Sequence, residues 1–192
     1  MRGRRDRRPR RHDRGDRGEP ARVDERDQGR HRLTGGAYSV PAVQRLVATL
    51  VASKPGGRIA EIGTSYGDGA EAIASALAGG ASFVTVELDA ERAAAARARL
   101  AGTDAEVLHG DWRDVLPPLA PFDVLFADGG VGYERAVDLL APGGILVKDD
   151  LTPGGAIEGD PVREALLLDP RVAATEILVT TEMACVVAVR RT

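Results

Sequence analysis

From residue 39 onward, short apolar segments alternate with segments of helical periodicity, and this alternation constrains the fold more than any other feature. The first helical pattern opens with Pro41, which suits the first turn of a helix, and apolar residues follow at i, i+3, i+4 and i+7. We predict helices at 41–52, 69–78, Ala90–Leu100, Tyr133–Leu140 and Pro161–Leu168. Between them we predict strands at Arg58–Ile62, Ser82–Glu87, Ala105–Leu108, Phe122–Ala127 and Ile145–Lys148.

Strands separated by helices of about ten residues are typical of βαβ units and a parallel sheet with helices on both sides. Two further β-rich runs, 172–179 and 182–190, have only two or three residues between them. A parallel crossover needs a dozen residues or so, so we expect these runs to form an antiparallel hairpin. The predicted fold class is α/β: a Rossmann-like, doubly wound sheet of seven strands, mostly parallel, with a C-terminal antiparallel hairpin.

Charge divides the chain into two parts. Residues 1–32 contain 13 Arg and 7 acidic residues, whereas the remainder has a net charge of −9. The first part has too few apolar side chains to offset an ordering entropy of roughly 1–2 kcal/mol per residue. We therefore expect a disordered Arg-rich tail at 1–32 and one domain at 33–192. A basic arm could attract nucleic acid, but this one lacks aromatic residues to stack on bases, and a solvated tail is the simpler interpretation.

The composition excludes several classes of protein. No apolar run reaches the roughly 18 residues of a transmembrane helix, and no apolar segment follows the basic start as in a secretory signal. The single cysteine, Cys185, cannot form an internal disulfide or supply a zinc cluster. We expect a reduced, cytoplasmic protein with no membrane partner.

The loop after the first predicted strand, EIGTSYGDG at residues 61–69, gives the first functional signal. Glycines between a strand and a helix allow a sharp turn and the close approach of a ligand. The spacing G-x-x-x-G-x-G is neither the dinucleotide fingerprint nor a P-loop, and acids are poor neighbours for phosphate. A ligand with an ammonium or sulfonium charge fits better, although a tight turn without a ligand remains the alternative. The predicted cofactor-binding residues of this loop are Glu61, Gly63, Thr64, Ser65, Gly67 and Gly69.

Two further strand ends add to this signal. Glu87 ends the second strand, where an acid can accept both hydroxyls of a ribose, as in NAD and adenosyl cofactors. Asp111 follows the third strand and could accept the amino group of adenine, and Trp112 could cover the face of the ring, although a core role is an equal alternative for Trp112. Because ligands of open α/β sheets bind at the carboxyl ends of the strands, we expect Glu61, Glu87 and Asp111 to surround one crevice.

Three more acids follow the next two strands. Asp128 comes after the fourth strand, and Asp149 and Asp150 come after the fifth, with Lys148 just before them. An oxygen-only cluster suits Mg²⁺ or another hard divalent cation. Alternatively, Asp128 binds the cofactor or abstracts a proton without metal, and the two later acids cap a loop.

In order and spacing, the segments EIGTSYGDG, VTVELD, HGDW, FDVLFADGG and GGILVKDD resemble class I S-adenosylmethionine-dependent methyltransferases. More narrowly, residues 34–190 resemble the catechol and caffeoyl-coenzyme A O-methyltransferase group. The resemblance implies a cofactor cradle at the glycine-rich loop, a ribose contact at Glu87 and an adenine contact at Asp111. It also implies a divalent cation at Asp128 and Asp149, with Asp150 where the family commonly has Asn, and a small-molecule hydroxyl acceptor.

The sequence departs from this group at two places. The lysine that acts as general base three residues beyond the strand-four acid is replaced by Val131. Lys148 could take that role, bind an acidic substrate or pair with Asp149. The helices that usually cap the acceptor pocket are missing, so the acceptor site is open, completed by a second subunit as in a homodimer, or not competent. The expected activity is methyl transfer from S-adenosylmethionine to a hydroxyl, with Asp128 and Lys148 as catalytic candidates. A nucleic-acid methyltransferase and a non-catalytic cofactor-binding protein are the rival hypotheses.

Overall fold

The computed structural model describes residues 39–129 and 133–192. The predicted tail at 1–32 and the departure at Val131 lie outside the described residues. The strands are β1 (Arg58–Ile62), β2 (Ser82–Glu87), β3 (Ala105–His109), β4 (Phe122–Ala127), β5 (Leu140–Leu151), β6 (Val172–Leu178) and β7 (Ala184–Arg190). The helices are α2 (Pro41–Ala52), α3 (Asp68–Ala76), α4 (Ala90–Arg99), α5 (Trp112–Val115), α6 (Tyr133–Ala136) and α7 (Pro161–Leu167), with short 3-10 turns η1 (Pro117–Leu119) and η2 (Val137–Leu139).

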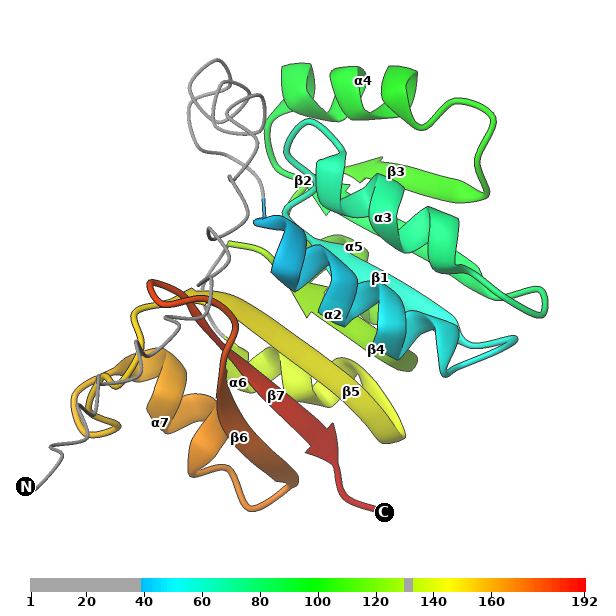
Figure 1. Cartoon of the computed structure of the whole chain (residues 1–192). Coiled ribbons are helices and arrows are strands. Elements are labelled where there is room, and N and C mark those ends of the chain that lie inside the picture. The colour runs from blue at the N-terminus through cyan, green and yellow to red at the C-terminus, as the bar shows by residue number, and fades with distance from the viewer. Residues whose placement is uncertain (1–38, 130–132) are drawn as a thin grey trace, which may run out of the picture. The chain divides into compact units, whose positions relative to one another are not determined.

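All seven strands form one sheet in the order β3-β2-β1-β4-β5-β7-β6 (Figure 1). The strands β1 to β5 pair in parallel, whereas β7 runs antiparallel to both β5 and β6. This arrangement confirms the predicted mostly parallel, Rossmann-like sheet with its C-terminal antiparallel hairpin. The order of strands changes direction between β1 and β4: β2 and β3 are added on one side of β1, and β4 and β5 on the other. Open α/β sheets form a ligand-binding crevice at this point.

Helices cover both faces of the sheet because successive strand residues point to opposite sides. On one face, buried side chains of α2, α3 and α4 pack against Ile59, Phe83 and Phe126. On the other face, α5, α6 and α7 pack against Ala60, Leu125 and their neighbours. Three of these helices begin at aspartates that accept backbone N–H groups of the first turn: Asp89 for α4, Asp111 for α5 and Asp160 for α7.

The structure differs from the prediction around the fifth strand. The expected helix Tyr133–Leu140 ends at Ala136 and continues as η2, and Leu140 already belongs to β5. Leu140 is fully buried and pairs with Phe122 of β4, so β5 starts there, and the register shifts over the Pro-Gly-Gly segment before pairing resumes at Ile145. At its other end β5 is lengthened by pairing of Leu151 with Ala184, so Asp149 lies within the strand and not after it.

Smaller differences occur at the helices. The predicted helix 69–78 ends at Ala76, since Leu77 is already extended. The short helix α5 was not predicted, although Asp111 caps it by accepting the backbone N–H of Arg113. None of the helices in the described ranges is long and apolar enough to cross a membrane.

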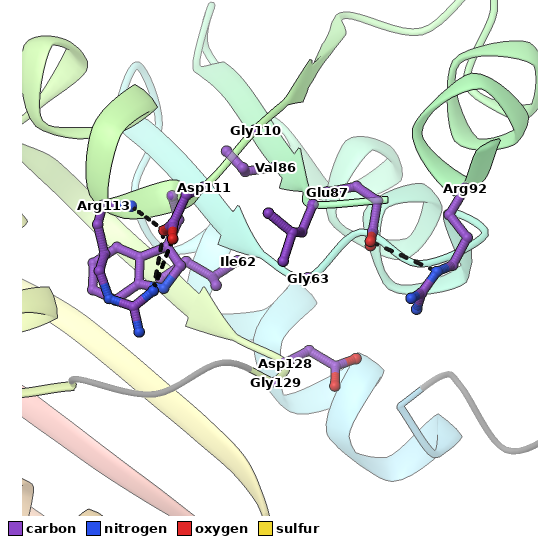
Figure 2. A pocket seen from close by; sticks show the side chains of 12 residues that line it. Ile62, Gly63, Val86, Glu87, Arg92, Gly110, Asp111, Arg113, Asp128 and Gly129 are labelled. Carbon is purple, nitrogen blue, oxygen red and sulfur yellow. Dashed lines mark hydrogen bonds and ion pairs between the residues drawn. The ribbon is translucent and has the colours of Figure 1, made fainter. Parts of the chain in front are cut away.

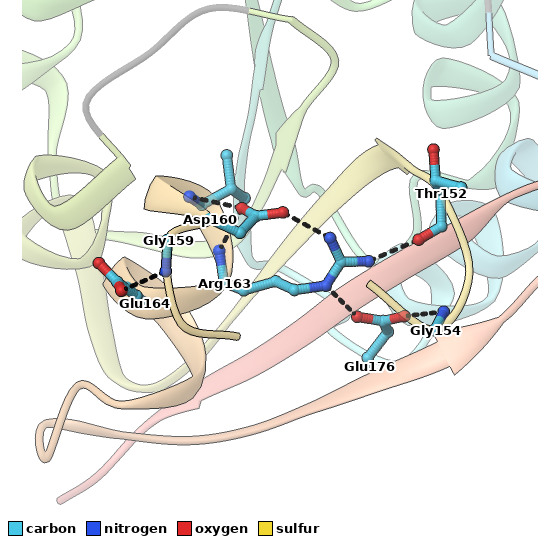
Figure 3. Close-up of polar contacts among 8 residues, drawn as sticks. Thr152, Gly154, Gly159, Asp160, Arg163, Glu164 and Glu176 are labelled. Atoms are coloured by element: carbon cyan, nitrogen blue, oxygen red, sulfur yellow. Dashed lines mark hydrogen bonds and ion pairs between the residues drawn. The ribbon is translucent and has the colours of Figure 1, made fainter. Parts of the chain in front are cut away.

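The segment between β5 and α7 is anchored by one buried arginine, Arg163, which is only 3% exposed (Figure 3). Its Nε donates to Glu176 Oε2 at 2.7 Å, and its Nη1 donates to Asp160 Oδ2 at 2.5 Å. Its Nη2 donates to the carbonyl of Thr152 at 2.6 Å. The guanidinium therefore ties residues 152–160 to β6 beside the acidic end of β5.

Candidate active site

A cavity of about 450 Å³ opens at the carboxyl ends of β1, β2, β3 and β4, a volume suited to a small-molecule cofactor. Glu87 and Arg92 lie opposite Asp111 and Arg113 across it (Figure 2). The predicted site residues that line it are Gly63, Glu87, Asp111, Trp112 and Asp128. The cavity is also lined by residues that the sequence did not single out: Ile62, Val86, Leu88, Arg92, Gly110, Arg113 and Gly129.

The glycine-rich loop passes very close to the end of β4. Gly63 has φ +91°, and a Cβ there would lie 1.8 Å from the carbonyl oxygen of Asp128. Only glycine fits this position, because a larger residue would both strain the backbone and collide with the neighbouring chain. The loop is also tied to β2, because the backbone N–H of Ser65 donates to Glu87 Oε2 at 2.8 Å. These contacts hold the ends of β1, β2 and β4 together around the cavity.

Glu87 presents a carboxylate whose orientation is fixed on both oxygens. Besides the bond from Ser65, Oε1 accepts the backbone N–H of Asp89 at 2.9 Å and lies 3.7 Å from Arg92 Nε. Each carboxylate oxygen can accept two hydrogen bonds, so acceptor capacity remains for a ligand. A buried, oriented acid at this point can accept the two hydroxyls of a ribose.

The opposite wall is built by Asp111, Trp112 and Arg113. Asp111 accepts the backbone N–H of Arg113 at 2.9 Å, and this bond, together with the guanidinium, lowers the pKa of the carboxyl group. Trp112 is 6% exposed and belongs to the core cluster under the sheet, so it combines the predicted core role with a place in the cavity wall. The guanidinium of Arg113 lies over the indole ring of Trp112, and this cation–π contact could not be predicted from the sequence.

Glu61 is not among the residues that line the cavity. It points to the α3 face of the sheet, where it is 1% exposed and accepts a hydrogen bond from Thr85 Oγ1 at 2.5 Å. The Thr64 hydroxyl lies 2.5 Å from that of Thr85, which continues the chain of polar contacts into the loop. A Cβ on Gly69 would approach Glu61 Oε1 to 2.7 Å, so this glycine makes room for the carboxyl group. Burial raises the pKa of Glu61 to about 8.

The expectation that Glu61, Glu87 and Asp111 surround one crevice therefore holds for two of the three acids. The side chain of Glu61 does not face the cavity, because neighbouring residues of β1 face opposite sides of the sheet. Five predicted loop residues are not among those lining the cavity in the described chain, and their role as ligand contacts stays a prediction: Glu61, Thr64, Ser65, Gly67 and Gly69.

The three later acids do come together. One carboxylate oxygen from each of Asp128, Asp149 and Asp150 lies within 4.8 Å of the others. Asp150 occupies the left-handed region with φ +61°, at the point where pairing between β5 and β7 is interrupted. Asp128 also lines the cavity, so the acidic cluster and the cavity share one residue.

Ser39 belongs to this site, although its position in the sequence, just before the helix that opens with Pro41, does not indicate it. Its hydroxyl lies 2.7 Å from Asp128 Oδ2 and 3.2 Å from Asp149 Oδ2 and is buried between them. The signal available in the sequence was a serine two residues before the helix-starting Pro41. Because α2 packs against the sheet, Ser39 lies beside the two acids.

The cluster fits a hard cation. Burial raises the pKa of Asp149 to about 7, with repulsion from Asp128 and Asp150 adding to the effect. Burial likewise raises the pKa of Asp128. Within the described residues, Asp149 Oδ1 accepts no hydrogen bond, and Lys148 Nζ is 3.7 Å from it. Carboxylate oxygens are the ligands that Mg²⁺ and Ca²⁺ prefer, and Asp149 Oδ1 is a buried one without a hydrogen-bond donor in the described residues.

The fold and the cavity at the carboxyl edge of its sheet are those of a Rossmann-like, cofactor-binding α/β protein. Comparison with known proteins agrees: residues 60–157 match a family described as methyltransferase domain. The chain therefore belongs to the methyltransferase domain family.

The similar proteins include both O-methyltransferases and protein-L-isoaspartate O-methyltransferases. A Streptomyces achromogenes O-methyltransferase, TomG, involved in tomaymycin synthesis and solved with SAM, is 27% identical with a TM-score of 0.72, over 88% of this chain and 89% of its own. A Bacillus cereus O-methyltransferase solved with SAH shares the fold, with a TM-score of 0.69 at 22% identity over 90% of this chain and 93% of its own. A Methylorubrum populi protein-L-isoaspartate O-methyltransferase is 36% identical over 125 residues, 63% of this chain. The chain spans 58% of the length of that curated relative.

Proposed function

We propose that this protein transfers a methyl group from S-adenosylmethionine to a hydroxyl group of a small molecule, with help from a divalent cation. The observation that carries the proposal is the position of Asp128. It lines the cavity beside Gly63 and also belongs to the acidic cluster with Asp149 and Asp150. A donor site and a cation site that share one residue would bring the methyl group and the acceptor oxygen together.

The residues present fit the donor. Glu87 would accept the ribose hydroxyls, and Asp111 would accept the amino group of adenine. Gly63 lines the cavity at the end of β1, where the methionine part of the donor would lie. When bound, S-adenosylmethionine supplies an electrophilic methyl group on a positively charged sulfur, which favours a cavity with carboxylates in its wall.

The acidic cluster and Lys148 would prepare the acceptor. A cation held by Asp128, Asp149 and Asp150 would lower the pKa of a hydroxyl group bound to it. Lys148 is 6% exposed and lies next to Asp149, so its ammonium would neutralise part of the negative charge. Only the neutral amine form of Lys148 would receive the hydroxyl proton. The sequence places no lysine at the position that the catechol-type resemblance assigns to the base.

Donor binding can be tested by calorimetry with S-adenosylhomocysteine, the demethylated product. We expect the wild-type protein to bind it and Glu87→Gln to bind it about tenfold more weakly, because charged hydrogen bonds contribute roughly 1.5–3 kcal/mol. Glu106→Gln, an exposed acid on β3, serves as the control. Absence of binding to the wild-type protein would refute the proposal.

Cation binding needs its own measurement. Titration with Mn²⁺, followed by the water relaxation that the paramagnetic ion produces, should give one site that Asp149→Asn weakens. Asp104→Asn changes an exposed acid in a distant loop and should leave the site intact. Equal Mn²⁺ affinity in both variants would remove the cation from the proposal but would leave donor binding in place.

The isoaspartate methyltransferase relatives favour a second candidate, methylation of a carboxyl group. Their similarity extends over 59–63% of this chain, with 36% identity in the Methylorubrum populi protein. Assays with an isoaspartyl peptide and with a catechol, each with and without Mg²⁺, separate the two. Methyl transfer to the peptide without any dependence on cations would favour the carboxyl group as the acceptor.

A further inference from the structure

The indole ring of Trp112 is covered by the guanidinium of its neighbour Arg113. The Arg113 Cζ atom stands over the ring, 5.1 Å from its centroid. Trp112 is nearly buried, whereas the side chain of Arg113 is 27% exposed and lines the cavity. The planar group with access to solvent at this wall is therefore the guanidinium.

Arg113 is held in place by Asp111. Its Nη1 donates to both carboxylate oxygens, at 3.1 and 3.0 Å, and its backbone N–H donates to Oδ1. Figure 2 shows the guanidinium and the carboxylate of Asp111 close together on the side of the cavity away from Glu87. A guanidinium fixed in this way loses little further freedom when a ligand arrives, and its flat face can stack on a base.

The charges on the two walls are also paired. Glu87 lies 3.7 Å from Arg92, and Asp111 lies 3.0 Å from Arg113. An uncharged nucleoside can lie between two such acid–arginine pairs without leaving a carboxylate unbalanced. The acidic cluster of Asp128, Asp149 and Asp150 forms no ion pair with an arginine within residues 39–129 and 133–192, and it meets the cavity at Asp128.

We propose that the flat face of the Arg113 guanidinium is the surface on which the adenine ring of the donor stacks, with Trp112 supporting it from behind. This inference rests on the proposed function, because it assumes an adenosyl ligand. It changes the sequence-based interpretation in one respect: Trp112 holds the stacking group and Arg113 contacts the base. Arg113 is thus a cofactor-binding residue that the sequence pattern did not indicate.

The test uses the fact that Trp112 is the only tryptophan of the chain, so its emission reports on this wall alone. Wild-type protein, Arg113→Ala and Arg113→Lys are titrated with S-adenosylhomocysteine by calorimetry and by fluorescence. Arg45→Ala, on the exposed side of α2, controls for loss of an arginine elsewhere, and circular dichroism checks folding.

We expect both Arg113 variants to bind about tenfold more weakly, since a stacked base is held by an interaction of this order. The lysine variant keeps the charge but lacks the plane, so it should not restore affinity. Saturation should change the emission of the wild-type protein little and should quench that of Arg113→Ala, where the base can reach the indole.

Three results overturn the inference in different ways. Suppose that the wild-type protein and Arg113→Ala bind the ligand equally well, and that the ligand quenches the tryptophan emission of both to the same extent. The base then lies directly on Trp112, and the proposed function stands. If Arg113→Lys restores full affinity, charge and not stacking is responsible. If the wild-type protein binds no ligand, both the inference and the proposed function are wrong.

Discussion

Replacing Glu61 with glutamine tests whether the protein folds with a neutral carboxyl group buried under its glycine-rich loop. Burial raises the pKa of Glu61 from 4.5 to about 8, and the charges of Asp128 and Asp149 act in the same direction. The hydrogen bond from Thr85 favours the charged form but does not outweigh burial. Near neutral pH the group is therefore protonated in the folded protein and ionised in the unfolded chain.

The expected magnitude follows from the two pKa values. Between pH 4.5 and about 8 the folded state holds a proton that the unfolded state releases. The stability that this group contributes is thus complete below pH 4.5 and is lost as the pH rises through about 8. In that window the free energy of unfolding should fall by up to about 1.4 kcal/mol per pH unit relative to Glu61→Gln, which does not titrate.

Urea unfolding of both proteins at a series of pH values measures this difference, with EDTA present so that no cation occupies the neighbouring acids. Glu106→Gln, an exposed position on β3, should follow the wild-type pH dependence closely. If the curves of wild type and Glu61→Gln run parallel over the whole window, the carboxyl group is ionised in the folded state. The argument from burial would then be refuted.

Two further predictions concern packing and the anchored loop. Gly63→Ala and Gly102→Ala share a backbone cost of roughly 1–2 kcal/mol because both glycines have positive φ, but only the first meets a backbone atom, the carbonyl oxygen of Asp128. Thermal unfolding should show an additional loss of about 1–3 kcal/mol for Gly63→Ala, and equal losses would mean that the loop can move aside. Arg163→Met should lower the free energy of unfolding by roughly 2–3 kcal/mol, because Glu176 loses its arginine partner, and Arg163→Lys should lower it less. Identical melting of both variants and the wild type would contradict the anchoring role.

The sequence alone determined the class of fold. Apolar strands, helical periodicity and the short gap before the last strand are local patterns, and the parallel sheet with its final hairpin follows from them by general rules of connection. The same rules place the acids after successive strands at one edge of the sheet. Asp128, Asp149 and Asp150 accordingly lie together, as their positions in the sequence indicate.

Tertiary structure decided what each side chain faces. Glu61 and Gly63 are two residues apart, yet one is buried beneath α3 and the other lines the cavity. Leu140 belongs to β5 and not to the preceding helix because it pairs with Phe122 of β4, although the register shifts over the turn-forming residues that follow. Ser39 and Arg113 enter the site only through contacts with other residues. Local sequence sets the period of an element, whereas the direction of a side chain depends on the neighbours against which the element packs.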